Sequence, residues 1–286
     1  MAVEPGRQCY QHRARSRIRP DVKAHHDIAQ DLRQALSQHQ AGRLDAAERG
    51  YRQVLARAPR QPDALHLLGV LAYQAGRHAV AIELIGQAVA IRPDAPEYHN
   101  NLGNAQKAAN DLESALGSYR RADAIRPNVP ETQNNLGNTL RMLGRLDEAE
   151  PHFKQALHLR PNYVEALVNY GVLLDDDQRS SKAEAALRQA IVLAPGFAPA
   201  HDNLGLVLTR LGRPREAEAS FLRAIELDPR LPMPHYNLGN LLQNLGRIAE
   251  AEAAYRQSIE RQPDLHTYVN LLFASNYDPD RSGEEI

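Results

Sequence analysis

Small and bulky apolar residues recur every 34 residues along most of the 286-residue chain. In each unit an alanine is followed four positions later by a bulky apolar residue, a spacing that puts both on one face of a helix. The alanines are Ala47, Ala81, Ala115, Ala149, Ala183, Ala217 and Ala251, and the bulky residues are Tyr51, Ile85, Tyr119, Phe153, Leu187, Phe221 and Tyr255. This pattern predicts a helix with a buried face in every unit.

Turn residues divide each unit into two helices. A Gly-Arg pair precedes the alanine, and its glycine can adopt the left-handed conformation that caps a preceding helix. A proline, which cannot continue a helix, closes the unit. The Gly-Arg pairs begin at Gly42, Gly76, Gly144, Gly212 and Gly246, and the prolines are Pro59, Pro93, Pro127, Pro161, Pro195, Pro229 and Pro263. Asn110 and Gln178 replace the turn glycine in two units.

The first helix of most units carries a glycine near its middle, usually within a Leu-Gly pair. These glycines are Gly69, Gly103, Gly137, Gly171, Gly205 and Gly239. A glycine inside a helix costs about 1 kcal/mol relative to alanine. Its recurrence at one position therefore predicts a close approach of two helices, where a Cβ atom would clash.

Leu-Gly, then Ala-x-x-x-aromatic, then Pro at a period of 34 resembles the tetratricopeptide repeat. The resemblance covers seven repeats over residues 28–265 and implies an all-α, right-handed superhelical solenoid of helix-turn-helix repeats with a concave surface. The chain departs from the family pattern in three ways. The family's frequent Trp is absent, the first repeat has Gln34-Ala35 in place of Leu-Gly, and Asp175-Asp176-Asp177 makes the fifth repeat irregular.

The two ends differ from the repeats. Residues 1–27 carry six Lys or Arg against three Asp or Glu and have no apolar stretch of signal-peptide type, so we expect an unstructured basic tail. Residues 266–286 begin as a further first helix, but no second helix follows. An open apolar end is expected there, through which the free chain would fray or form a homodimer.

Composition restricts the class of protein. The net charge of -1 disfavours a nucleic-acid binder, and no apolar run approaches the ~18 residues of a membrane helix. A single cysteine excludes an intramolecular disulfide framework. A cytoplasmic protein is expected, with no nucleic-acid or membrane partner.

One polar row repeats as regularly as the apolar positions. An asparagine stands before the Leu of the Leu-Gly pair or its equivalent, and a further asparagine follows 33 residues later in the terminal segment. The row consists of Asn101, Asn135, Asn169, Asn203, Asn237 and Asn270, widened by Asn104 and Asn138 one helical turn further on. Arg33 and Leu67 interrupt it in the first two repeats.

A row of amides is suited to binding a peptide backbone, because each amide offers donors and an acceptor together. Neighbouring helices lie ~8–10 Å apart and an extended chain rises ~3.3 Å per residue, so one asparagine meets about every third residue. The row therefore predicts a groove for extended segments of other proteins. An alternative, compatible with the first, is that these asparagines bond to the adjacent repeat and fix the stacking.

Charges beside the row lean acidic, with Asp63, Glu97, Glu131 and Glu165 at one repeat position. They indicate a basic or hydroxyl-rich partner or, more simply, a solvated face with acids near helix N-termini. A carboxylate clamp of the co-chaperone type needs Lys or Arg on the concave face. It is disfavoured because the equivalent positions hold His66, Asn100, Asn134, Val168 and Asp202.

Enzyme and metal motifs are missing from the sequence. There is no phosphate-binding loop and no zinc-protease motif. His99, His201 and His235 share a repeat position, but adjacent repeats are ~8–10 Å apart, too far for one metal with bonds near 2 Å. No catalytic residue, metal or cofactor is expected.

A second resemblance lies at the C-terminal end. Asn270-Leu271-Leu272-Phe273-Ala274, Asn276-Tyr277-Asp278-Pro279-Asp280 and Glu284-Glu285-Ile286 are similar to the junction between repeats and catalytic region in bacterial protein O-linked N-acetylglucosamine transferases (Spindly-like). In that family an asparagine row holds protein substrates by their backbone. The resemblance implies the substrate-recognition part of such a protein, joined to a catalytic region absent from these residues. The alternative is a stand-alone scaffold that assembles a protein complex.

Overall fold

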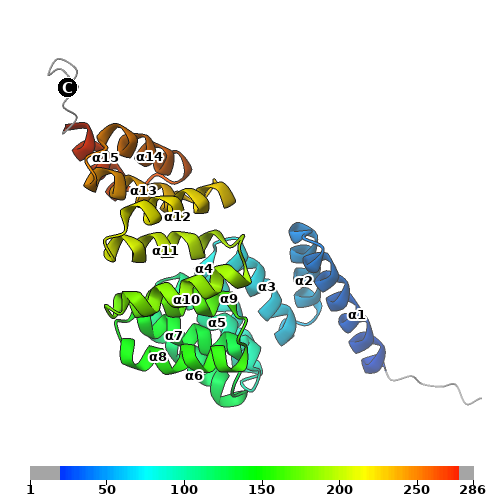
Figure 1. Ribbon diagram of the computed structural model, residues 1–286. Coiled ribbons are helices and arrows are strands. Elements are labelled where there is room, and N and C mark those ends of the chain that lie inside the picture. Colours follow the sequence, from blue (N-terminus) through cyan, green and yellow to red (C-terminus); the bar gives the residue numbers. More distant parts are fainter. Residues whose placement is uncertain (1–19, 277–286) are drawn as a thin grey trace, which may run out of the picture. The chain divides into compact units, whose positions relative to one another are not determined.

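The computed structural model describes residues 20–276, with side chains for residues 27–275, and this part contains fifteen α-helices and no strand. The chain forms two compact units that meet between Ala109 and Asn110. Unit 1 contains α1 (Pro20–Gln40), α2 (Leu44–Arg57), α3 (Pro62–Gln74), α4 (His78–Ile91) and α5 (Pro96–Ala108) (Figure 1). Unit 2 contains α6 (Leu112–Ile125), α7 (Pro130–Met142), α8 (Leu146–Leu159), α9 (Val164–Asp176), α10 (Ser180–Leu193), α11 (Ala198–Arg210), α12 (Pro214–Leu227), α13 (Pro232–Asn244), α14 (Ile248–Arg261) and α15 (Leu265–Asn276). The predicted all-α class is confirmed.

The helices alternate in length as the sequence period requires. From α3 to α13 every first helix has 13 residues, and from α2 to α14 every second helix has 14. The repeat that contains Asp175-Asp176-Asp177 keeps these lengths, so the acidic run leaves the helix pair intact. Helix α1 begins at Pro20, eight residues before the predicted first repeat. The predictions for residues 1–19 and for the motif residues after Asn276 lie outside the described part.

Residues with a left-handed backbone conformation join the two helices of a repeat, as predicted for the turn glycines. The five turn glycines have φ between 70° and 75°, and the substitutes Asn110 and Gln178 have φ of 62° and 58°. After Gln178, the N–H of Arg179 donates to the carbonyl of Leu174 at 2.8 Å, which matches the bond from Arg213 to Leu208 after a glycine turn. The backbone therefore keeps one capping geometry whichever residue occupies the turn.

In five repeats the first helix presents a glycine to the bulky residue of the second helix, at Gly69, Gly137, Gly171, Gly205 and Gly239. A Cβ built on Gly205 would lie 2.5 Å from Cε1 of Phe221, and one on Gly239 would lie 2.5 Å from Cε1 of Tyr255. The bulky residues themselves are at most 1% exposed: Tyr51, Ile85, Tyr119, Phe153, Leu187, Phe221 and Tyr255. The glycines are required for this close helix packing, as the sequence predicted.

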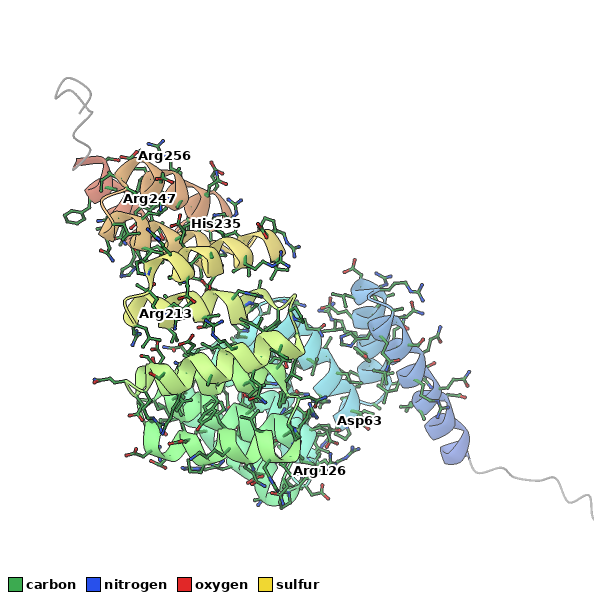
Figure 2. The ribbon with its side chains drawn as sticks, in the orientation of Figure 1. Asp63, Arg126, Arg213, His235, Arg247 and Arg256 are labelled. Carbon is green, nitrogen blue, oxygen red and sulfur yellow. The ribbon has the colours of Figure 1, made fainter. Side chains whose placement is uncertain are left out.

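Ion pairs link the second helices of successive repeats. In unit 2 the arginine after the turn reaches a glutamate 29 positions earlier, in three pairs: Arg179 with Glu150, Arg213 with Glu184 and Arg247 with Glu218. Figure 2 shows Arg213 at the start of α12 and Arg247 at the start of α14. The bond from Arg179 lowers the pKa of Glu150 to about 2. These pairs lie near the surface, where each is worth at most about 1 kcal/mol, so their main effect is on the alignment of repeats.

Helix α15 leaves an apolar face uncovered. Among the side chains that the structure describes, Leu265, Tyr268, Val269, Leu272 and Phe273 are 41% to 74% exposed. The sequence analysis predicted such an open end, and that a second copy of the chain covers it stays a prediction. No helix in the described part is long and apolar enough to cross a bilayer.

Replacing Gly205 with alanine should destabilise unit 2 by about 1–3 kcal/mol, because the added methyl group overlaps the Phe221 ring. The control is Gly117→Ala on α6, where a Cβ meets no atom within 4 Å and alanine should stabilise the helix by about 0.5–1 kcal/mol. Urea denaturation followed by circular dichroism measures both. Equal effects of the two substitutions would show that the glycine–ring contact does not determine the packing.

Candidate functional site

The first helices form the inner face of each unit. Within unit 2, α7 contacts α9, α9 contacts α11, α11 contacts α13 and α13 contacts α15, and in unit 1 α3 contacts α5. Among the elements described, second helices of successive repeats make no comparable contacts. Helices that approach each other more closely lie on the inside of a curve, so the first helices line the concave side within each unit. We call this surface the inner face.

The asparagine row runs along the contacts between these first helices. Asn169 on α9 donates from Nδ2 to Oδ1 of Asn134 on α7 at 3.0 Å, and Asn237 on α13 donates to Oδ1 of Asp202 on α11 at 2.9 Å. In unit 1, Nδ2 of Asn101 on α5 lies 2.8 Å from Nε2 of His66 on α3. Each of these bonds joins residues 35 positions apart. The row therefore connects neighbouring repeats, which is the stacking role that the sequence left open.

Two members of the row depart from this pattern for local reasons. The residue 35 positions before Asn203 is Val168, whose side chain cannot accept a hydrogen bond, and Nδ2 of Asn203 donates to the carbonyl of Pro199 in its own helix at 2.8 Å. Asn270 lies one residue out of step with the repeat. Its Nδ2 reaches the hydroxyl of Tyr236 at 3.3 Å and Oδ1 of Asn240 at 3.0 Å.

The flanking amides have partners as well. Oδ1 of Asn138 accepts from Arg141 at 3.4 Å, and Asn135 and Asn104 are each half-buried and engaged in polar contacts. Asn237 is only 6% exposed, whereas Asn169 and Asn203 are partly open to solvent. The predicted binding residues thus differ in access, and their role in peptide binding stays a prediction.

Two side chains of the row are oriented so that their oxygen atoms, and not their NH₂ groups, are available to a ligand. Asp202 can only accept when ionised, so Asn237 must present its NH₂ group to the previous repeat. Asn169 and Asn203 also donate from Nδ2. Among the residues that the structure describes, none donates to Oδ1 of Asn169 or Asn203. On the inner face of unit 2, Asn169 and Asn203 therefore present their amide oxygens, which are acceptors.

Two members of the acidic series beside the row form ion pairs within their own repeats. Asp63 forms a two-pronged pair with Arg92, at 2.9 and 3.2 Å, and Glu131 pairs with Arg160. Burial raises the pKa of Asp63, but hydrogen bonds from Tyr98 and Arg92 outweigh it and bring the pKa below its ordinary value. At these two positions the structure therefore weakens the case for a basic partner.

Asp202 differs from these acids. Burial raises its pKa to about 6, although the hydrogen bond from Asn237 opposes the shift. No described residue forms an ion pair with it. Only the amide of Asn237 stabilises its charge on the inner face of unit 2.

The repeated histidines have a structural explanation. His99, His201 and His235 each place Nε2 within 2.9–3.4 Å of the carbonyl of the proline six residues earlier, which fixes the loop before the first helix. No group of three His, Cys, Asp or Glu residues in the described part could hold a metal ion.

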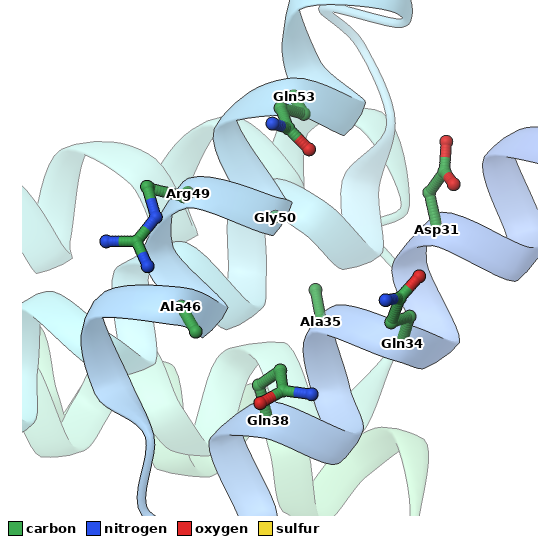
Figure 3. Close-up of a pocket in the computed structure, with 8 residues that line it drawn as sticks. All are labelled: Asp31, Gln34, Ala35, Gln38, Ala46, Arg49, Gly50 and Gln53. Atoms are coloured by element: carbon green, nitrogen blue, oxygen red, sulfur yellow. The ribbon is translucent and has the colours of Figure 1, made fainter.

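Two of the depressions in unit 1 involve helix α1, and neither was predicted from the sequence. One, of about 240 Å³, lies between α1 and α2 and is lined by small and polar residues, including Gln34, Gln38 and Gln53 around Ala35 and Gly50 (Figure 3). The other, of about 250 Å³, lies among α1, α3 and α5 and is largely apolar. Its only signal in the sequence was the interruption of the asparagine row at Arg33 and Leu67, which both line it.

Paired helices stacked through a repeated inner face define an all-α repeat solenoid. Three profiles described as tetratricopeptide repeat or TPR repeat match the chain at residues 130–163 and 233–265, at residues 32–96 and 79–130, and at residues 205–246. The chain belongs to the tetratricopeptide repeat family. No curated protein sequence gives a significant match.

Solved structures share the fold. A tetratricopeptide repeat protein from Parabacteroides merdae superposes with a TM-score of 0.76 at 15% identity, covering 87% of this chain and 99% of that one. A thermophilic TPR protein of Thermus thermophilus gives 0.59 at 28% identity, covering 64% and 100%. The Cut9–Hcn1 hetero-tetramer of the APC/C gives 0.72 at 15% identity, covering 84% of this chain and 48% of that one. The predicted repeat solenoid is confirmed.

Replacing Asn237 with alanine should raise the pKa of Asp202 above about 6, because the only hydrogen bond that favours its charged form is lost. At neutral pH the variant should also lose about 1–3 kcal/mol of stability. A carboxyl NMR titration measures the pKa, and Asn203→Ala, which breaks a bond within one helix, is the control. An unchanged Asp202 pKa in the Asn237 variant would contradict the assigned contact.

Proposed function

We propose that the inner face of unit 2 binds extended segments of other proteins through their backbone N–H groups. The observation that carries this proposal is the orientation of the asparagine row. Asn169 and Asn203 use their NH₂ groups internally, and their Oδ1 atoms accept no hydrogen bond from any described residue. A tetratricopeptide repeat solenoid is typical of protein–protein interaction scaffolds, which supports a protein ligand.

The internal bonds make the row better suited to this task. Each NH₂ group that is held by the helix or by the previous repeat fixes its side chain, so less conformational entropy is lost when a ligand binds. With ~8–10 Å between neighbouring helices, the oxygens match about every third N–H of an extended chain. Half-buried Val172 and exposed Leu206 lie one helical turn beyond Asn169 and Asn203 and offer apolar surface to the ligand side chains.

Replacing Asn135, Asn169 and Asn203 together with alanine should weaken binding of an extended peptide by tenfold or more. The variant removes the accepting oxygens of Asn169 and Asn203, each worth about 0.5–1.5 kcal/mol in a hydrogen bond to the ligand, and about 1.4 kcal/mol corresponds to a factor of ten. The probes are blocked 12-residue peptides selected on the immobilised chain from a random library, and fluorescence anisotropy measures their affinity. Helix content by circular dichroism should stay unchanged.

Two controls isolate the backbone interaction. Asn162→Ala with Gln189→Ala removes exposed amides outside the first helices and should leave affinity unchanged. A selected peptide that carries N-methyl groups at every third residue should lose affinity for the wild-type chain, because it lacks the N–H donors. Unchanged affinity of the triple variant, or full binding of the methylated peptide, would refute the proposal.

A narrower role is proposed from the C-terminal segment. Residues 270–274 of α15 and the motif that follows resemble the junction of bacterial protein O-linked N-acetylglucosamine transferases, in which the repeats select substrates. In this proposal the chain is the substrate-recognition part of such a protein and has no transferase activity alone. The rival is a stand-alone scaffold unrelated to glycosylation.

The mass of the native gene product separates these two roles. An immunoblot of source-cell extract with antibodies against the repeats should show a band much heavier than 31.9 kDa if a catalytic region follows. Recombinant chain run on the same gel is the control for mobility. A band at 31.9 kDa would exclude the transferase arrangement and favour the scaffold, whose partners would then be sought by affinity purification.

A further inference from the structure

A largely apolar pocket occupies the inner face of unit 1 where the asparagine row is interrupted. Its volume is about 250 Å³, and it is lined by Leu32, Arg33 and Leu36 of α1, Asp63, His66 and Leu67 of α3, and Glu97 and Tyr98 of α5. Sites for whole small molecules are usually about 300–1,000 Å³, so the volume fits a single large side chain better. Arg33 and Leu67 stand where the other repeats carry the asparagine.

The floor of the pocket is a fixed histidine with one unused ring nitrogen. His66 is 8% exposed, its ring stacks on Tyr98 with centroids 4.4 Å apart, and Nε2 accepts from Nδ2 of Asn101. Nδ1 therefore carries the proton, and no described residue accepts it. Burial lowers the pKa of His66 to about 4, so the ring stays neutral at physiological pH. An N–H without a protein partner that lines an apolar pocket is available to an acceptor from a ligand.

The charges around the pocket favour an acidic neighbour in that ligand. Asp63 is held by Arg92 and by the hydroxyl of Tyr98, and Glu97 is engaged as well. Arg33, in contrast, is exposed and makes no ion pair with any residue that the structure describes. Its guanidinium is thus the available charge at the rim.

We propose that this pocket holds one large aliphatic side chain of an extended segment of a partner protein. In the bound segment, a backbone carbonyl accepts from Nδ1 of His66, and an acidic side chain beside the aliphatic one pairs with Arg33. The inference rests on the proposed function only in that the ligand is an extended protein segment. Unit 1 then recognises side chains, whereas the amide oxygens of unit 2 bind any backbone.

Selection of random 12-residue peptides on the immobilised full chain tests this assignment. Wild-type chain should enrich peptides with Leu, Ile or Met next to Asp or Glu, and changing that aliphatic residue to alanine should weaken binding about tenfold. Leu67→Asn, which puts the asparagine of the other repeats at the pocket, should remove the aliphatic preference. Arg33→Glu, an exposed substitution without risk to the fold, should convert the preference for an acidic neighbour into one for Lys or Arg.

Any other outcome of the peptide selection overturns the inference. Enriched peptides without an aliphatic–acidic pair, or the same pair enriched by Arg33→Glu and Leu67→Asn, would mean that the pocket does not choose the ligand. Peptides that lack the pair but lose affinity in the triple asparagine variant would leave the proposed function intact and refute only the pocket. If no peptide is enriched at all, both proposals fail.

Discussion

Contact between a glycine of the first helix and a bulky residue of the second is the constraint on which this structure depends. At Gly205 and Gly239 the ring of the second helix lies where a Cβ atom would be. The two helices of a repeat therefore pack at a distance that only glycine allows. Because the same contact recurs, the repeats that carry this glycine share one helix-pair packing, and side chains at equivalent positions form rows across the unit. A functional surface made of repeated residues requires that regularity.

In the proposed function, a side chain of the asparagine row serves stacking and recognition together. An amide has donors and an acceptor on opposite atoms, so the NH₂ group can bond to the protein while the oxygen faces a ligand. Asn169 bonds to the previous repeat and Asn203 to its own helix, yet both present the same oxygen. The two interpretations that the sequence left open are thus compatible in the structure, and the internal bonds orient the acceptors.

Period and residue type were enough to predict the helix pairs, the left-handed turns at the Gly-Arg pairs and the close approach at the glycines, whereas the left-handed conformation of Asn110 and Gln178 came from the structure. These features are set by residues within one repeat. The partners of the polar residues could not be predicted, because they depend on which side chain faces which across a helix contact. Asp63 was expected on a solvated acidic face, but Arg92, 29 residues later, reaches back to it. The pocket around His66 was missed for the same reason, since three helices contribute to it.

A crystal structure of the chain with a selected peptide tests the central claim most directly. The account predicts an extended peptide on the inner face of unit 2, with backbone nitrogens about 2.9 Å from Oδ1 of Asn169 and Asn203. The bonds from these two side chains to Asn134 and Pro199 should be preserved. A peptide bound on the second helices, or asparagines rotated so that Nδ2 faces the ligand, would contradict it.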